Sequence, residues 1–150
     1  MERLAFPTLR YVLMVPRSAL PDKSAAGIHA VGVLPFVMLT GDGQFVSNVE
    51  RVAKVNELNF QIRARVETFS LAVEAAKVLS AAVFVPTQAE KEFPVEEFTP
   101  VALDAIRELD RPLAVVFGRK TAELNTRARR FALRLSRAFE ISSGVESRRP

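Results

Sequence analysis

The chain has 150 residues, of which 49% are hydrophobic and 25% are charged, and its formal net charge is +4. This balance is typical of a globular chain with one core and excludes a disordered protein, so we expect a single domain over residues 1–150. The sequence contains no cysteine, which excludes disulfides and thiolate metal sites.

The charged residues indicate which classes of partner the protein can bind. Sixteen arginines stand against five lysines, and arginine pairs with planar anions such as carboxylates and phosphates through two hydrogen bonds. The four asparagines and three glutamines are few, which hints at a thermophilic source. Residues 1–16 make a poor secretory signal, and the apolar run 28–39 is shorter than the roughly 20 residues that span a bilayer. We therefore expect a cytoplasmic protein without a membrane partner, and the oligomeric state stays open.

The first third of the chain predicts strands and a turn. Residues 9–15 are rich in β-branched and aromatic side chains and end at Pro16, which indicates a strand. Residues 28–33 fit either a strand or a buried helical turn, because the run is too short to decide. Residues 36–39 are apolar at consecutive positions, which indicates burial on both faces. The Gly-Asp-Gly of residues 41–43 predicts a turn.

A helix and a strand are expected next. Apolar residues recur at helical spacing over 46–57, with a cap at Ser47 and a stop at Asn56 or Asn59. Over 60–66, apolar residues alternate with polar ones, which predicts a strand with one face toward the core and the other polar.

The middle of the chain combines two patterns. Residues 70–82 have helical spacing and 78–85 resemble a strand, so we expect a helix that passes into a strand near Ser80. Residues 87–100 predict a surface connection. Thr99 as a cap and a proline at the first helical position then predict a helix over 100–109.

The C-terminal part predicts a buried strand over 113–117 and a helix over 121–139. The helix would pack through four apolar residues, Leu124, Ala128, Phe131 and Leu135. A strand that buries Leu133 together with Phe131 and Leu135 is the alternative. Residues 142–150 are expected to fray. The predicted fold class is α+β: a mainly antiparallel sheet of four to six strands with flanking helices.

Two isolated polar residues favour structural roles. His29 is the only histidine and lies in an apolar run, so a buried, hydrogen-bonded histidine is the more common outcome and a catalytic base the rarer one. Asp42 stands alone between two glycines, and one acid is too few to hold calcium or magnesium. A turn residue that bonds its own backbone is the expected role. The sequence therefore predicts no metal and no cofactor.

Two arginine sets are candidates for anion binding. Arg63 and Arg65 are two residues apart on the predicted strand, so they would share a face and clamp a carboxylate; a solvated face balanced by Glu67 is equally compatible. The tail carries a basic stripe that suits phosphate contacts, and its alternative is an exposed amphipathic helix face. The stripe consists of Arg127, Arg130, Arg134 and Arg137.

Several short motifs, in this order, resemble the N-terminal half of chorismate lyase-like proteins. The resemblance implies an antiparallel sheet flanked by helices, shared with effector-binding domains of some transcription regulators. It also implies that the stretch before the Asp-Gly turn is an apolar helix. The motifs that carry the resemblance are residues 9–11, 15–16, 34–50, 60–67, 78–86 and 111–117.

The resemblance implies an enzyme that splits chorismate into pyruvate and 4-hydroxybenzoate. Arg63 or Arg65 would then be the first carboxylate-holding arginine, and the position of the second is occupied by Ala81 or Ala82. Glu140 or Glu146 would be the C-terminal acid. The leading function is therefore the binding of a small aromatic or enol carboxylate, with chorismate lyase activity as the reaction to test. The alternative is a nucleic-acid-associated protein that uses its tail arginines.

Overall fold

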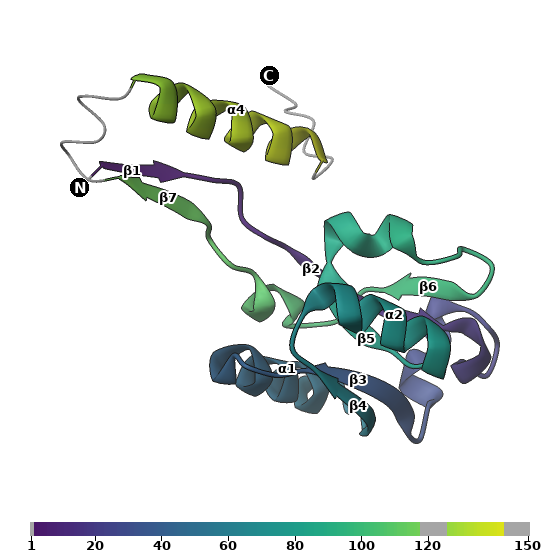
Figure 1. Ribbon diagram of the computed structural model, residues 1–150. Coiled ribbons are helices and arrows are strands. Elements are labelled where there is room, and N and C mark those ends of the chain that lie inside the picture. Colours follow the sequence, from purple (N-terminus) through teal and green to yellow (C-terminus); the bar gives the residue numbers. More distant parts are fainter. Residues whose placement is uncertain (1, 118–125, 143–150) are drawn as a thin grey trace, which may run out of the picture. The chain divides into compact units, whose positions relative to one another are not determined.

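The computed structural model describes residues 2–117 and 126–142 of the chain (Figure 1). The chain separates into two compact units, one formed by residues 10–110 and the other by residues 1–9 together with 111–150. The single domain stays a prediction. Its frayed tail lies outside the described residues, except for Ser142.

The larger unit contains strands that lie side by side in one continuous row. β2 pairs antiparallel with both β5 and β6, and β3 pairs parallel with β4. A parallel bridge between Phe36 and Ala82 joins β3 to the start of β5, with N–O distances of 2.9 and 2.7 Å. The resulting order is β4-β3-β5-β2-β6. The strands are β2 (Tyr11–Pro16), β3 (Leu34–Leu39), β4 (Phe60–Val66), β5 (Val83–Pro86) and β6 (Phe98–Val101).

Helices α1 (Gly43–Val55) and α2 (Phe69–Leu79) cover opposite faces of the sheet that these strands form (Figure 1). Val37 of β3 packs in the cluster that contains Ala72 and Val73 of α2. The next residue, Met38, lines a hollow together with Ala53 of α1. Because successive strand residues point to opposite faces, the two helices lie on different sides.

The predicted elements of this unit are largely confirmed. The strand over 60–66, the helix before it and the helix that turns into a strand at Ser80 are all present. Asp42, rather than Ser47, caps α1 through the Phe45 N–H at 3.0 Å. Asn56 ends α1 as expected. The first three residues of the ambiguous run 28–33 end a short 3-10 helix, η2 (Ala25–Ala30), and the run contains no strand.

The predicted helix over 100–109 is wrong. Thr99 and Pro100 belong to β6, where they pair with Val15 and Met14 of β2. Proline is tolerated there because β6 is an edge strand in the described sheet, so one row of its N–H groups needs no partner strand. Helical structure begins only at η4 (Ile106–Leu109).

The expected surface connection over 87–100 is also partly wrong. It contains η3 (Thr87–Glu92) and two buried phenylalanines. The rings of Phe93 and Phe98 lie 5.0 Å apart in the α2-facing core. The prolines and glutamates around these two phenylalanines are typical of an exposed loop, so the sequence did not indicate their burial.

The smaller unit pairs β1 (Glu2–Ala5) antiparallel with β7 (Ala114–Phe117) and contains α4 (Thr126–Ser142). The strand over 113–117 is confirmed, but Val116 is 54% exposed, so the strand is not buried as expected. The α+β class is confirmed in its coarse form, helices with antiparallel strand pairs.

The tail helix is confirmed and its strand alternative is wrong, but the expected packing face is not the buried one. Phe131 is 66% exposed and Leu135 is 44% exposed, whereas Ala132 is buried. Leu124 and the Ala128 side chain lie outside the described residues. Apolar periodicity identified the helix correctly and the contact face incorrectly.

Candidate functional site

The chain path identifies one edge of the larger sheet. From β3 the chain passes through α1 to β4, and from β4 it returns through α2 on the other face to β5. Because β4 and β5 lie on opposite sides of β3, the direction of winding reverses at the carboxyl end of β3. In open sheets of this kind, ligands bind outside the carboxyl ends of the strands at such a switch point. This edge is the candidate functional site.

Short polar and small residues form the rim of the edge. Thr40 closes the end of β3 on β4, because its N–H and its Oγ1 both donate to the Val66 carbonyl, at 2.7 and 3.1 Å. Gly41 follows with φ of 90°, a conformation that favours glycine. A Cβ built on Gly41 or Gly43 would meet no atom within 4 Å. The rim is therefore open to a ligand.

The first turn of α2 offers partial positive charge at this edge. Thr68 is exposed and caps the helix by accepting the Leu71 N–H at 3.3 Å. Its hydroxyl is neutral, so the positive end of the helix dipole is not offset by its cap. At α1 the Asp42 carboxylate occupies the equivalent position. An anion is therefore favoured at α2 over α1.

Three aromatic rings form the floor beneath the rim. Tyr11, at the start of β2, lies 5.2 Å from the ring of Phe45 and 5.7 Å from the ring of Phe69, measured between centroids. Tyr11 and Phe45 are buried and Phe69 is half-buried. The cluster brings the first turns of the two helices together, so the site rests on a rigid support.

Two exposed charges flank the rim. The carbonyl of Arg10 accepts the Thr87 N–H at 3.0 Å, which places Arg10 beside the end of β5. Glu67 directly follows β4. One charge favours an anion near the rim and the other opposes it, so their formal charges cancel.

The predicted arginine pair lies at an irregularity in β4. Ile62 pairs with Phe36 and Ala64 with Val37, which leaves Arg63 as an extra residue. Phe60, Ile62 and Arg65 line a hollow of about 340 Å³.

The irregularity changes which face the apolar residues occupy. Ala64 and Val66 pack against the α2 cluster instead of lining the hollow with Phe60 and Ile62. The expectation of one apolar face along the whole strand is therefore wrong. Arg63 is exposed and is not among the residues that line the hollow, so the structure places only Arg65 there. The carboxylate clamp stays a prediction.

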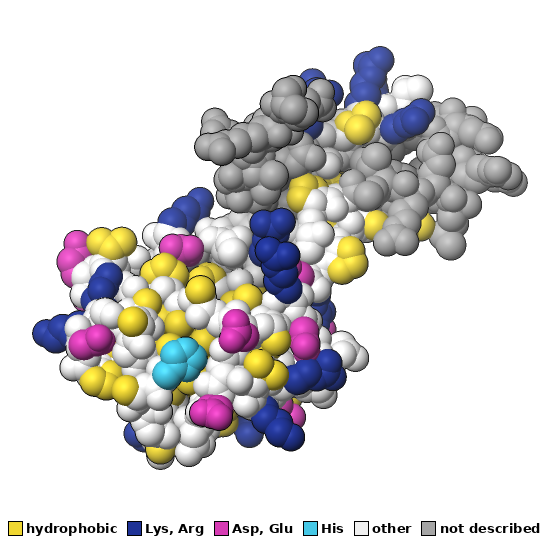
Figure 2. Space-filling view, turned by 180° about the vertical axis from the view of Figure 1, so that it is seen from behind, with side chains coloured by type: hydrophobic (Ala, Val, Ile, Leu, Met, Phe, Trp, Pro, Cys, Tyr) yellow, Lys and Arg dark blue, Asp and Glu magenta, His cyan; other side chains and the backbone are white. Residues whose placement is uncertain are grey.

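The other predicted residues do not join the edge. His29 is exposed rather than buried, and Figure 2 shows the histidine at the surface among hydrophobic side chains. In the smaller unit, Arg127, Arg130, Phe131 and Arg134 line a shallow hollow of about 230 Å³ on α4. Arg137 is exposed, and Glu140 lies on α4 with a side chain outside the description.

Two features are absent from the part of the chain that the structure describes. These residues contain no group of three histidine, cysteine or acidic side chains that could hold a metal ion. Within the same ranges, no helix has the length and apolar character that crossing a bilayer requires.

The fold is similar to those of regulatory proteins. The regulatory domain of CcmR from Synechocystis PCC6803, in complex with 2-PG, matches with a TM-score of 0.59 at 14% identity, over 90% of this chain and 66% of that one. An OxyR C206 mutant from Corynebacterium glutamicum matches with a TM-score of 0.57 at 13% identity, over 95% of this chain and 45% of that one.

A third structure is CbnR, a LysR family transcriptional regulator, with a TM-score of 0.50 at 17% identity, over 75% of this chain and 39% of that one. The chain thus spans less than two-thirds of the length of each of these proteins. No protein-family model and no curated protein matches the sequence.

The predicted resemblance to chorismate lyase-like proteins is wrong, because these similar structures belong to a different class of protein. The three solved structures described above are regulators or their regulatory domains. The apolar stretch before the Asp-Gly turn is strand β3 and not a helix. Local motifs misled here because an apolar run of six residues fits a buried strand as well as a helix.

Thr40, Thr68 and Arg10 were missed as candidates from the sequence. A signal existed for Thr68, since a threonine directly before a helical apolar pattern indicates an N-cap. Nothing local indicates that the ends of β3, β4 and β5 share one edge, because strand order is a property of the whole unit.

Proposed function

We propose that the chain is the ligand-binding part of a transcriptional regulator and that it binds a small carboxylate or other small anion at the switch point between β3 and β5. One observation carries the proposal: the open rim at the carboxyl ends of the strands, with the neutral cap of α2, lies in a fold shared with a regulatory domain in complex with 2-PG. Chorismate cleavage is not part of this function.

The site supplies recognition rather than chemistry. The N–H groups of the first turn of α2 and the hydroxyl of Thr68 provide donors for an oxyanion. Arg10 adds a long-range attraction. The half-buried ring of Phe69, backed by the buried rings of Tyr11 and Phe45, gives an apolar or aromatic body a surface to pack on.

The likeness to a regulatory domain in complex with a small ligand favours this function over the nucleic-acid alternative. The tail arginines of α4 lie in the other unit, and the described part of that unit offers a shallow helix face rather than an enclosed site.

A charge placed at the α2 terminus tests the site. Ser70 is exposed in the first turn of α2, so Ser70→Glu adds a carboxylate that the helix dipole tolerates, while Ser70→Gln adds the same bulk without charge. Titration calorimetry with 2-PG and with benzoate should show binding to the Gln variant at near wild-type affinity. Binding to the Glu variant should be at least about tenfold weaker. Equal affinity of the two variants would place the ligand elsewhere.

A second variant acts in the opposite direction. Glu67 is exposed beside the rim, and Glu67→Gln removes a negative charge without changing shape. We expect tighter anion binding, by about two- to fivefold at low ionic strength, and a smaller effect in salt. Weaker binding would show that Glu67 contacts the ligand directly.

A further inference from the structure

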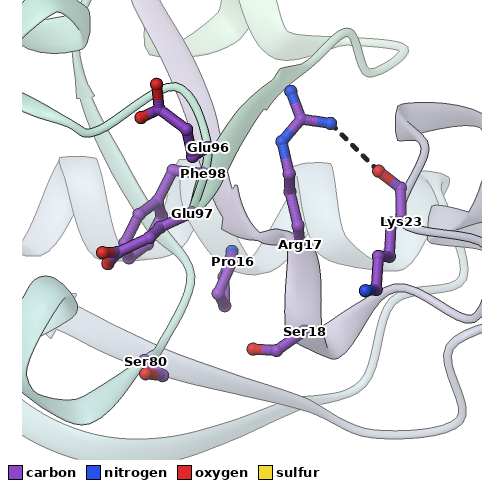
Figure 3. Close-up of a pocket in the computed structure, with 8 residues that line it drawn as sticks. All are labelled: Pro16, Arg17, Ser18, Lys23, Ser80, Glu96, Glu97 and Phe98. Carbon is purple, nitrogen blue, oxygen red and sulfur yellow. Dashed lines mark hydrogen bonds between the residues drawn. The ribbon is translucent and has the colours of Figure 1, made fainter.

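A second pocket lies at the opposite end of the larger sheet. It has a volume of about 360 Å³ and is formed where β2 ends, where α2 ends at Ser80, and where β6 begins. Figure 3 shows the residues that line it. They are Pro16, Arg17, Ser18, Lys23, Ser80, Glu96, Glu97 and Phe98.

Arg17 holds the walls of this pocket in place. Its Nε donates to the Val95 carbonyl at 3.0 Å and its Nη1 to the Lys23 carbonyl at 3.1 Å. Its backbone N–H donates to the Glu97 carbonyl at 2.7 Å. These three bonds tie the turn that contains Lys23 to the segment before β6, so the two walls are fixed relative to each other.

The two walls carry opposite charges that do not meet. Figure 3 shows Glu97 and Ser80 on one side, and Lys23 and Ser18 on the other. Within the described residues, no ion pair of 4.0 Å or less joins Lys23 to Glu96 or Glu97, although all three line the same hollow. The end of α2 at Ser80 adds partial negative charge on the Glu97 side. A pocket whose walls carry separate charges of both signs matches a ligand that carries both.

We propose that this pocket binds a small zwitterion, a molecule with an ammonium group and a carboxylate a few atoms apart, as in an α-amino acid. The ammonium group lies against Glu97 and the end of α2. The carboxylate lies against Lys23 and the hydroxyl of Ser18. This site is separate from the switch point, because it is built from the opposite ends of the same strands.

Titration of the full chain with L-glutamine, followed by calorimetry or by chemical-shift changes, tests the proposal. L-glutamine should bind, whereas acetate and methylammonium, which each carry one of the two charges, should bind at least about tenfold more weakly. Acetate that binds as well as glutamine would reduce the pocket to an anion site and overturn the proposal. Absence of glutamine binding would also overturn it.

Variants locate the binding. Lys23→Gln and Glu97→Gln should each weaken glutamine binding by about tenfold or more. Glu92→Gln is the matched control: it removes the same charge from an exposed residue that does not line the pocket, and binding should change less than twofold. Loss of affinity in only one of the two pocket variants would show that the ligand uses only one of the two charges, and this result would overturn the zwitterion proposal.

The variant Ser70→Glu separates the two sites. It should leave glutamine binding unchanged while it weakens binding of 2-PG or benzoate. Loss of glutamine binding in this variant would place the zwitterion at the switch point and not in the second pocket.

Discussion

The ring of Phe45 in the first turn of α1 meets the ring of Phe69, the first residue of α2, edge to face: their centroids are 5.9 Å apart and their planes are at 89°. The two helices cover opposite faces of the sheet, so the contact joins their first turns at the edge at which they both begin. A contact of this kind is worth about 0.5–1.5 kcal/mol beyond the area it buries. It holds the rim of the candidate site in one geometry.

Removal of the Phe45 ring should destabilise the larger unit. Phe45 is 2% exposed and contacts the rings of Tyr11 and Phe69. We expect Phe45→Ala to lower the free energy of unfolding by about 3–5 kcal/mol, measured by urea denaturation. The neighbouring Val46→Ala changes a half-buried residue and should cost about 1 kcal/mol or less. Equal effects of the two variants would contradict the aromatic support.

Asn56 should be a second stability-determining residue. Its side chain is buried, donates to the carbonyls of Val52 and Asp104 at 2.8 Å each, and accepts the Asp104 N–H at 3.0 Å. Asn56→Ala leaves these backbone groups without partners, and each such loss costs about 1–3 kcal/mol.

The Asn56→Ala variant should therefore lose at least about 2 kcal/mol of stability in the same denaturation assay. Asn59→Ala is the control, because Asn59 is exposed and should change stability by less than about 0.5 kcal/mol. An effect of Asn56→Ala as small as that of the control would mean that water replaces all three bonds.

In contrast to Phe45, Phe131 lies on the exposed face of α4, so we expect its removal to have little effect on stability. Phe131→Ala and Leu133→Ala both change side chains that are more than 40% exposed, at 66% and 42%. Each should alter the free energy of unfolding by no more than about 0.5–1 kcal/mol. A loss of about 3–5 kcal/mol for Phe131→Ala alone would indicate a partner surface that buries this face.

Variants of Arg65 and Ser70 test whether the anion binds in the hollow lined by Arg65 or at the switch point. We expect Arg65→Gln, which changes the arginine that lines the hollow beside α1, to reduce benzoate affinity less than Ser70→Glu does. Arg63→Gln is the control, because Arg63 is exposed and does not line the hollow. A loss of about tenfold in Arg65→Gln, with no effect of Ser70→Glu, would move the anion site to the hollow.

Most secondary structure could be predicted from the sequence because its causes are local. The helical spacing before Asn56, the alternation over 60–66 and the change from helix to strand near Ser80 each depend on neighbouring residues. The tail helix was likewise visible in its 3.6-residue period. The error over 100–109 arose because threonine followed by proline is a helix start in isolation, while pairing with β2 makes it an edge strand.

The sequence by itself determined the class of the protein: a cysteine-free α+β chain, rich in arginine, with a turn and a helix after a buried apolar element. Only the tertiary structure decided where the candidate sites lie. The rim at Thr40 and Thr68 exists because β4 and β5 lie on either side of β3, and the two walls around Lys23 and Glu97 exist because Arg17 joins segments 78 residues apart. Local propensity carries no information on strand order or on such long-range contacts, since both are set by the packing of the whole unit.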